Sequence, residues 1–505
     1  MRHNSIAILG IPLDNLTMEE TVESVFSMIE EYHTDKRPRQ VCTVNTDFVV
    51  NTLSWSLIKT RHPELMDILR KADLVTADGM PLVWASRLLG SPLKGRVTGA
   101  DLVPELAREA SQRQKSIYLL GGKGDVAIQA ARILEKRYPD LIIAGCDSPF
   151  VHIEGEALID ALESDLPVVD RINASGADIL LIAFGNPKQE LWFERNRHRL
   201  KVPVSIGIGG TFEFITGSVQ RAPAWMQHTG LEWLFRLTQD PRRLWKRYLI
   251  DFLKFGILVW PSILHYHCKK LILHNLRPAQ TDHEILYKPL RDNDKEAFVL
   301  HMPWRFNISA ATAMNEILEQ EAIKNQSLIL DFSDVLLIDS NGLGFLLNLY
   351  YSCMRDDRGL FITGLRPTAK RAFSYNRMSD LLYHFSFNSI EDAQRAVSEK
   401  AWASSLLYYE VTEDDNESVV SFFGELTAAQ TADKDTSELL GRISTTRCTI
   451  DLSHTTRIDS SGIIFILKFY RALLQKDCSC TISGISQNIS QMVHITKMTD
   501  FLYTI

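Results

Sequence analysis

The sequence predicts an α/β protein with a mainly parallel sheet in its first half and two smaller α/β domains in its second half. Apolar strand patterns alternate with helical patterns as far as residue 247, several of these strands are apolar throughout, and one pattern of the second half occurs twice. A chain of 505 residues is also long enough for about three domains.

The alternation in the first half predicts βα units around a sheet. We expect helices at Thr17–Tyr32, Ala100–Gln114 and Val126–Tyr138. Strands that are apolar along their whole length are typical of a sheet covered by helices on both faces. Residues 1–247 are therefore predicted to form a Rossmann-like domain that ends in a basic appendage over 230–247, with strands at Gln40–Val44, Leu74–Ala77, Ser116–Leu120, Asp140–Ala144, Asp178–Phe184 and Pro203–Ile208.

An apolar run at Phe255–Leu264 follows this domain and is flanked by charged residues such as Asp251 and Lys269. Because a spanning helix needs roughly 20 apolar residues, we expect no membrane span, but a helix that packs on a partner or lies at a membrane interface. Residues 248–282 are interpreted as this helix and a linker. The N-terminal apolar run is too short for a signal peptide.

The second half contains an internal repeat. Asp331, Asp339, Gly364 and Met378 recur 120 residues later, without a gap, as Asp451, Asp459, Gly484 and Met498. Two copies of this length indicate a tandem of two domains, over 283–398 and 405–505, rather than a solenoid.

Charge and cysteine content narrow the function classes. A net charge of −7 argues against a nucleic-acid partner, since such proteins usually carry a basic excess. The seven cysteines include no CxxC pair, which favours reduced thiols and a cytoplasmic location.

Polar and glycine motifs follow the predicted strands of the first half repeatedly. In an open parallel sheet, ligands bind outside the carboxyl ends of the strands. The sequence therefore predicts a binding cleft at this rim, formed by Thr43, Asn45, Asp78, Gly121, Gly122, Gln189, Gly209 and Gly210.

Each motif also has a plainer interpretation. Gly121–Gly124 is either an anion cradle at a helix start or a tight βα turn, and it matches neither the dinucleotide fingerprint nor a P-loop. Asp78 is either part of an Asp-Gly turn or a general base that takes a proton from a hydroxyl. Gln189 is a surface helix position or a site residue.

The basic residues of the first half also have both a structural and a functional interpretation. Arg96 is a solvated charge or an anion clamp. The stretch from Gly230 to Arg247 packs five cations and three aromatics into a short helical segment. It is a solvated face, a pyrophosphate clamp or a docking face for anionic lipid.

Together these motifs resemble the WecG/TagA/CpsF family of glycosyltransferases, over about residues 5–247. The resemblance rests on their order and spacing: Thr43-x-Asn45, Ala77-Asp-Gly-Met80, Arg96-Val-Thr-Gly99, Gly185-x-Pro-x-Gln-Glu190, Gly207-x-Gly-Gly210, Arg221-Ala-Pro223 and Gly230-Leu-Glu-Trp-Leu-x-Arg-Leu237. Glu213 stands where the family would have Asp.

This resemblance implies an inverting, metal-independent transfer from a UDP-sugar, typically of the N-acetylmannosamine type or a related hexose or uronic acid. The implied acceptor is a polyprenyl-diphosphate-linked sugar. Asp78 would be the general base. The sugar and phosphates would be bound by Thr43, Asn45, Arg96 and Gln189, and Arg236, Arg243 and Arg247 would offset the charge on the departing diphosphate, with no metal or other cofactor.

The two repeats resemble STAS domains of anti-sigma-factor antagonists. Asp339-Ser340 and Asp459-Ser460 precede apolar helices, so N-capping by the aspartates is the simple interpretation. The resemblance marks Ser340 and Ser460 as candidate phosphorylation sites. Asn341 replaces the usual second Ser or Thr of the first copy, and Ile463-Ile464 replaces Leu-Gly in the second.

We therefore predict a glycosyltransferase of cell-surface polysaccharide synthesis that is cytoplasmic and peripherally bound to the inner face of the membrane. The STAS-like domains would dock a protein partner or a kinase, and homo-oligomerisation stays open. The alternative is a non-catalytic regulator that senses a nucleotide-sugar. A nucleotide-dependent oxidoreductase ranks below both.

Overall fold

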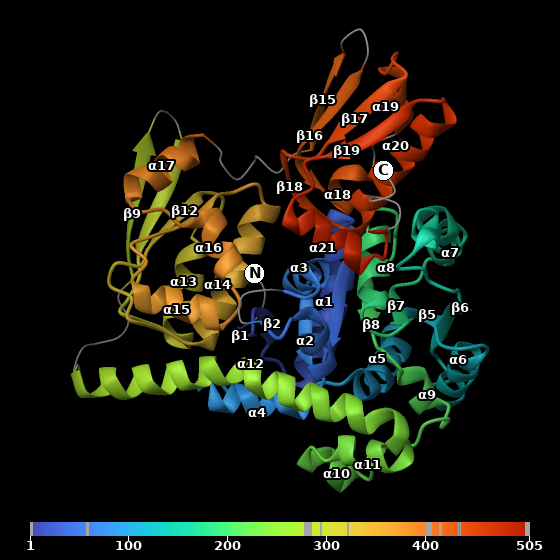
Figure 1. The fold of residues 1–505 in the computed structure, drawn as a ribbon. Helices are drawn as coiled ribbons and strands as arrows, with labels where there is room; N and C mark the ends of the chain where they lie inside the picture. Colours follow the sequence, from blue (N-terminus) through green and yellow to red (C-terminus); the bar gives the residue numbers. More distant parts are fainter. Residues whose placement is uncertain are drawn as a thin grey trace.

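A computed structural model of the chain describes residues 4–56, 60–276, 285–292, 295–320, 323–399, 407–413, 417–432, 434 and 436–499. They form three α/β units that pack against one another (Figure 1). We refer to them as the N-terminal unit, up to residue 276, the first repeat unit, 285–399, and the second repeat unit, 407–499. The predicted fold class is confirmed.

The N-terminal unit is built on a six-stranded sheet in the order β4-β3-β8-β7-β5-β6. All neighbouring strands in it are parallel. The six predicted strands are all present, with small shifts at their ends: β3 (Arg39–Val44), β4 (Leu74–Ala77), β5 (Ser116–Gly121), β6 (Ile142–Asp147), β7 (Ile179–Ala183) and β8 (Val204–Gly207).

Helices cover both faces of this sheet, as the apolar strands predicted. One face packs on α1, α5, α6 and α9, and the other packs on α2, α3, α4, α7 and α8. Their bounds are α1 (Met18–Asp35), α2 (Thr46–Thr52), α3 (Pro63–Lys71), α4 (Met80–Leu88), α5 (Gly99–Arg113), α6 (Val126–Arg137), α7 (Ala161–Ser175), α8 (Lys188–Asn196) and α9 (Thr211–Ile215), with a 3-10 turn η1 at Glu156–Leu158.

An N-terminal hairpin, β1 (Ser5–Ile8) and β2 (Ile11–Asp14), was not predicted. Leu9 and Gly10 turn it with φ of 53° and 79°, as a two-residue hairpin loop requires. Ile6 and Ile8 face the core of the N-terminal unit, whereas Ala7 faces the core of the first repeat unit. Both faces are buried, so the sequence lacks the polar alternation that marks a strand.

The basic appendage is not one helix. It forms α10 (Ala224–Thr229), α11 (Glu232–Gln239) and the start of α12 (Pro241–Leu276). The chain turns at Gly230, with φ of 78°, and again before Pro241, which opens α12 because a proline lacks the N–H that the first turn leaves unused. Helix α12 also extends into the predicted linker, and residues 277–282 of that linker lie outside the described residues.

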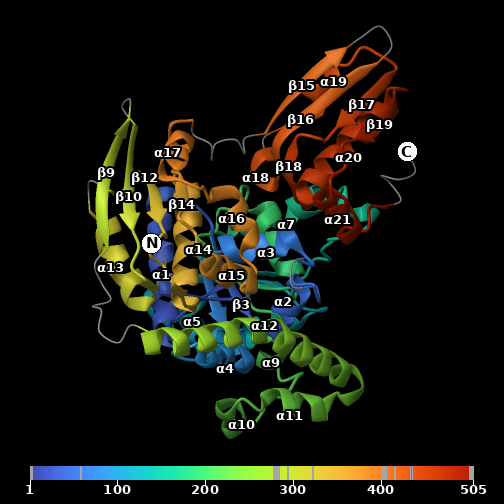
Figure 2. The same ribbon diagram turned by 60° about the vertical axis from the view of Figure 1, so that its left-hand side comes forward.

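Helix α12 runs along the N-terminal and first repeat units in both ribbon views (Figures 1 and 2). It packs on α2, α4, α11 and α15. Buried Lys254 on this helix donates to the carbonyl oxygens of Val50, at 2.7 Å, and Leu53, at 2.6 Å. By length and composition, Leu244–Leu273 could cross a membrane, but one face of the helix is packed against protein.

The first repeat unit has a four-stranded sheet in the order β14-β12-β10-β9 and a small β11-β13 pair. Its elements are β9 (Leu286–Asp292), β10 (Lys295–His301), β11 (Arg305–Phe306), α13 (Ile308–Leu318), β12 (Ser327–Asp331), β13 (Leu337–Ile338), α14 (Ser340–Arg355), β14 (Leu360–Thr363), α15 (Pro367–Tyr375), α16 (Ser379–Phe385) and α17 (Ile390–Ser398).

The second repeat unit repeats this plan with the sheet path β15-β16-β17-β19, from which β18 pairs with β16. Asp339 and Asp459 cap α14 and α20 by accepting from Gly342 and Gly462, as predicted. Its elements are β15 (Tyr408–Glu413), β16 (Ser418–Leu426), α18 (Ala428–Thr431), α19 (Thr436–Gly441), β17 (Arg447–Asp451), β18 (Thr455–Ile458), α20 (Ser460–Gln475), β19 (Ser479–Ser483) and α21 (Gln487–Ile495).

Both repeat units rest on the N-terminal unit through the first turns of these equivalent helices. A side chain at Gly344 of α14 would collide with the backbone of Ser5 in β1. At the matching position of α20, Ile464 is buried against Leu158 and Ala161. The sequence difference between the two copies therefore reflects two different surfaces of the N-terminal unit.

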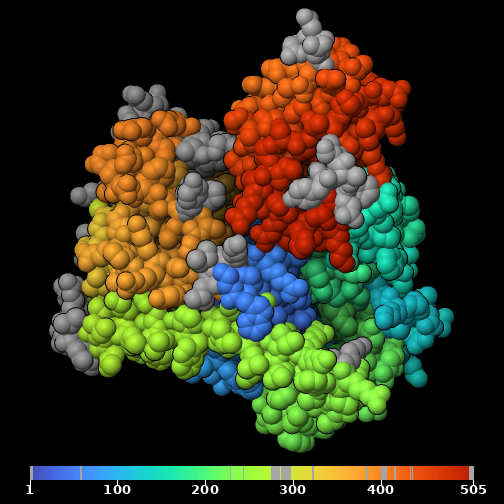
Figure 3. Space-filling model, in the orientation of Figure 1, coloured from blue at the N-terminus to red at the C-terminus, as the bar shows by residue number. Residues whose placement is uncertain are grey.

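Helix α3 lies between the two repeat units. Its Arg70 donates to the carbonyl oxygen of Arg377, at 2.7 Å, and to Asp380, at 2.6 Å, in the first repeat unit. Its Asp67 forms an ion pair with Arg457 of the second repeat unit. In the space-filling view, blue N-terminal residues lie directly below the red lobe (Figure 3).

Candidate active site

The carboxyl ends of five neighbouring strands bring the predicted site residues to one rim. Asp78 follows β4, Asn45 follows β3, Gly209 follows β8, Gln189 lies after β7 at the start of α8, and Gly121 ends β5. Because all these strands are parallel, their ends meet at the same edge of the sheet. The structure therefore assembles the rim that the sequence predicted.

Asp78 lies at this rim between β4 and α4. Its backbone N–H donates to the carbonyl oxygen of Val44 at 2.7 Å, and its carboxylate accepts from the N–H of Gly99. Burial raises the pKa of Asp78 to about 7, and nearby Glu232 adds to this shift, while Arg236 and Arg96 act against it. A carboxylate with a pKa near neutrality suits a general base.

This pKa predicts the pH dependence of activity. Only the ionised carboxylate accepts a proton, so kcat/KM should rise about tenfold per pH unit below pH 7 and level off above it. An ordinary aspartate, with a pKa near 4, would instead give a flat profile from pH 5 upwards. A pH series with a fixed donor concentration measures this midpoint, and a flat profile would exclude Asp78 as the titrating base.

Thr43 and Gln189 hold the loop after β8 rather than lying on the surface. The hydroxyl of Thr43 donates to the carbonyl oxygen of Gly207 at 2.8 Å. The amide of Gln189 accepts from the N–H of Gly209 at 3.1 Å and donates to Glu190 at 2.7 Å. Both side chains are buried, so the surface-helix interpretation of Gln189 is wrong.

Asn45 and Arg247 lie around the start of α2. The side chain of Asn45 caps this helix by accepting from the N–H of Asp47 at 3.0 Å. Arg247 of α12 pairs with the same Asp47 at 2.7 Å. Arg243 belongs to α12 as well, but its side chain lies outside the described part of the structure.

The glycines at the end of β5 form a tight turn. Gly121 has φ of 104°, and a Cβ there would lie 2.8 Å from the backbone of Ala183. The N–H of Gly122 donates to the carbonyl oxygen of Ala183 at 3.1 Å. Gly121 is required because β5 and β7 approach closely at the rim, whereas Gly122 is favoured by its φ of 78°.

An arginine cluster, which we define as Arg96, Arg221 and Arg236, lies beside Asp78. Arg96 donates to Glu232 at 2.9 Å, and Arg236 donates to the same carboxylate at 3.2 Å. Arg221 pairs with Asp101 and lies 3.9 Å from Glu232. The sequence pointed to Arg96 and Arg236 as site residues, but not to Arg221, Glu232 or Asp101, although each of these stands inside or beside a motif.

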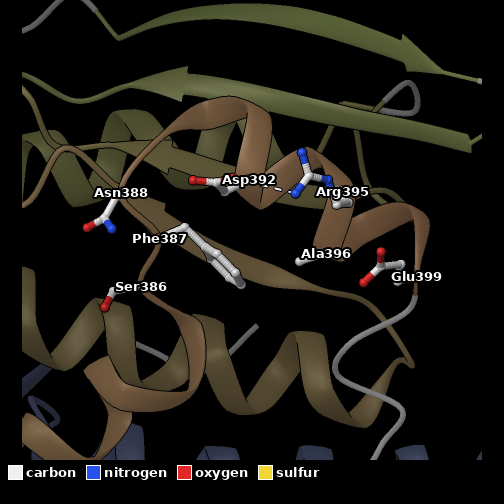
Figure 4. A pocket seen from close by; sticks show the side chains of 7 residues that line it. All are labelled: Ser386, Phe387, Asn388, Asp392, Arg395, Ala396 and Glu399. Atoms are coloured by element: carbon white, nitrogen blue, oxygen red, sulfur yellow. Dashed lines mark ion pairs between the residues drawn. The ribbon is translucent and has the colours of Figure 1, made fainter.

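A separate open cavity of about 350 Å³ lies in the first repeat unit, beside α17. Figure 4 shows the ion pair of Asp392 and Arg395 and the ring of Phe387 pointing into the space below it. The lining carries charges of both signs and none of the sequence motifs. The rim and its arginine cluster are therefore the stronger candidate for catalysis.

Comparison with known proteins identifies the families that the parts of this chain resemble. Residues 6–268 match the family model described as "Glycosyl transferase WecG/TagA/CpsF family". Residues 289–393 and 408–505 each match the STAS domain model. All the candidate rim residues and the arginine cluster fall within the first match.

Two similar proteins carry the same name, "N-acetylglucosaminyldiphosphoundecaprenol N-acetyl-beta-D-mannosaminyltransferase". The one from Bacillus subtilis (strain 168) is 31% identical over 233 residues, which are 46% of this chain and 84% of the relative. The one from Staphylococcus aureus (strain MW2) is 29% identical over 242 residues, which are 48% of this chain and 86% of the relative. Both aligned lengths are close to that of the N-terminal unit.

Proposed function

The chain belongs to the WecG/TagA/CpsF glycosyltransferase family, and we propose that it transfers an N-acetylmannosamine-type sugar from a UDP-sugar to a polyprenyl-diphosphate-linked N-acetylglucosamine. The names of the similar transferases support this acceptor and sugar. The observation that carries the proposal is the position of Asp78, a carboxyl with a raised pKa, beside three arginines at one rim. In this proposal Asp78 is the base and the arginines form the anion site.

The proposed reaction is a single displacement with inversion. Asp78 takes the proton from the acceptor hydroxyl, whose oxygen attacks the anomeric carbon of the donor. The bond from that carbon to the β-phosphate oxygen breaks, and UDP leaves with the electron pair. Arg96 and Arg236 are placed to stabilise the negative charge that develops on the diphosphate, which is the part that a divalent metal plays in other transferases.

UDP release by the full chain tests this proposal. We would offer a panel of UDP-sugars with a lipid-diphosphate-N-acetylglucosamine analogue, with chelator present throughout. Chelator-resistant turnover of one donor is the expected result. UDP-sugar binding without turnover of any donor would instead favour the alternative of a non-catalytic regulator.

We propose that the outer face of α12 rests on the cytoplasmic membrane, where the acceptor would be embedded. Large apolar side chains recur along this face at helical spacing and are exposed: Trp245, Leu249, Phe252, Ile257, Trp260, Leu264 and Leu271. Contiguous exposed apolar surface of this kind marks an interaction site. Basic residues near both ends of the stripe, Lys246 and Lys269 among them, would favour anionic lipid.

Removing two of these side chains should weaken membrane binding. Phe252 and Trp260 are 61% and 59% exposed, so replacing both by serine costs little packing within the protein. Because each large side chain buried in lipid contributes about 2 kcal/mol, we expect more than tenfold weaker flotation with anionic vesicles. Ile128→Ser with Ile133→Ser, exposed positions of α6, is the matched control, and equal flotation of both double variants would contradict the assignment.

We further propose that the STAS domains regulate the transferase by docking on its own N-terminal unit. The starts of α14 and α20 carry the buried serines Ser340 and Ser460. Asn341, next to Ser340, donates to Ser91 of that unit at 2.7 Å, and Ser460 donates to Glu64 at 2.7 Å. A separate protein partner or a kinase would reach these surfaces only when the contact opens.

A further inference from the structure

Glu232, the first residue of α11, lies at the centre of the arginine cluster. Its two carboxylate oxygens each accept from a different guanidinium, Oε2 from Arg96 at 2.9 Å and Oε1 from Arg236 at 3.2 Å. Arg221 lies 3.9 Å from Oε2. Arg96, which lies 136 residues away in sequence, therefore meets two arginines of the C-terminal appendage region at one carboxylate.

This carboxylate is enclosed, with only 10% of its side chain exposed. Three guanidinium groups this close would repel one another without an anion between them. Asp101 supplies a second negative charge, through its ion pair with Arg221. Together the five side chains carry three positive and two negative charges, so the cluster keeps one excess positive charge.

The cluster also has unused donors. Among the described residues, no hydrogen-bond partner is present for the buried Nε atoms of Arg221 and Arg236. A carboxylate and a diphosphate present similar pairs of oxygens to a guanidinium, but the diphosphate carries more charge and more oxygens. A diphosphate entering the cluster would therefore compete with Glu232 for the same guanidinium groups.

We propose that Glu232 is an internal stand-in for the donor diphosphate: it holds the three arginines and α11 beside Asp78 in the empty enzyme, and the diphosphate displaces it. This inference rests on the proposed UDP-sugar donor and deepens it. Glu232 is a positioning residue, since it acts through the arginines rather than on the reacting atoms. Glu232 keeps the cations arranged before the donor arrives, and its return to the arginines speeds the release of UDP afterwards.

The position of α11 next to Asp78 supports this positioning role of Glu232. Gly230, just before α11, packs against Met80 and Trp84 of α4, directly after Asp78. The charged groups that face Asp78 are Arg96, Arg221, Arg236 and Glu232. Loss of the Glu232 charge would thus strengthen anion binding and lower the pH at which Asp78 ionises.

Glu232→Gln tests the inference by calorimetric titration of the full chain with UDP. Removing the competing anion should tighten UDP binding about tenfold, equivalent to about 1.4 kcal/mol, and shift the midpoint of the kcat/KM profile to lower pH. A merely structural glutamate would give the same shift of the midpoint, because its charge also acts on Asp78, but its loss would weaken UDP binding. Glu105→Gln, which neutralises an exposed partner of Arg108, is the matched control and should change neither value.

Two further measurements keep the outcome decisive. Should the glutamine variant melt below the assay temperature, Glu232→Asp retracts the charge by one methylene and should tighten UDP binding to a smaller degree. Inorganic pyrophosphate is the second probe, because it needs the cation cluster but no nucleoside site. Wild-type protein that binds pyrophosphate but not UDP would refute the proposed UDP-sugar donor, and the role of Glu232 could still be tested with pyrophosphate. Unchanged or weaker pyrophosphate binding by a folded Glu232→Gln variant would overturn the inference.

Discussion

Replacing Asp78 by asparagine is expected to lower turnover by about 100- to 10,000-fold, the range that a general base contributes. Asparagine keeps the size of the side chain and still accepts a hydrogen bond from the N–H of Gly99. It cannot take up the proton of the acceptor hydroxyl. The loss should therefore fall on kcat, and the affinity for UDP should stay the same or increase, because one negative charge near Arg96 and Arg236 is gone.

The measurement is a pair of experiments on the same preparation, UDP release under saturating donor and calorimetric binding of UDP. Asp125→Asn is the matched control, since Asp125 is an exposed aspartate beyond the end of β5, near the same rim. It should retain wild-type turnover. If Asp78→Asn retains more than a tenth of wild-type turnover, another group must accept the proton.

The sequence predicted the rim well because that rim depends on local order. In a parallel sheet, whatever follows a strand lies at the carboxyl edge, so Asp78 and Asn45 could be placed from their position after β4 and β3 alone. The helix-capping aspartates of the repeats were predictable for the same local reason, since Asp339 and Asp459 precede apolar helices.

Features that depend on distant contacts were not predictable. In the sequence, Glu232 is one acidic residue in a basic segment. Only the fold brings Arg96, 136 residues away, into contact with its carboxylate. The hairpin at Ser5–Asp14 is buried by a domain that begins more than 250 residues later, so its sequence shows no polar face. The extent of α12 was missed because its apolar run is supported by packing against α2, α4 and α15.

The second repeat unit offers the other large expected effect. The hydroxyl of Ser460 donates to the carboxyl of Glu64 on α3 at 2.7 Å, and its N–H donates to the other oxygen at 3.2 Å. Burial, together with the neighbouring Asp459, raises the pKa of Glu64 to about 8. The contact therefore disfavours negative charge, and an acid at Ser460 would add to the charges of Glu64 and Asp459.

We expect Ser460→Asp to release the second repeat unit from the N-terminal unit. A second acid against buried Glu64 should cost about 3 kcal/mol, roughly a 100-fold loss in the docking equilibrium. The fold of the repeat unit itself should survive, because an aspartate in the first turn of α20 favours the helix. A protease site inserted between Glu399 and Leu407 would then let the C-terminal fragment separate on gel filtration, whereas in wild-type protein it should co-elute.

Two variants distinguish loss of docking caused by the charge at residue 460 from loss caused by misfolding. Ser486→Asp places the same charge at the start of α21, where the serine is exposed, and should leave docking intact. Glu64→Gln added to Ser460→Asp places an amide, which cannot ionise and can donate a hydrogen bond, opposite the new carboxylate and should restore co-elution. Such rescue would show that the charge at position 460 acts on Glu64 of α3. Helix α3 packs on α2 and α8, the helices that begin beside Asn45 and Gln189. The effect of a modification at Ser460 would then be transmitted to the active-site rim through α3. Failure of the rescue would mean that a charge at Ser460 does not act on the transferase through Glu64.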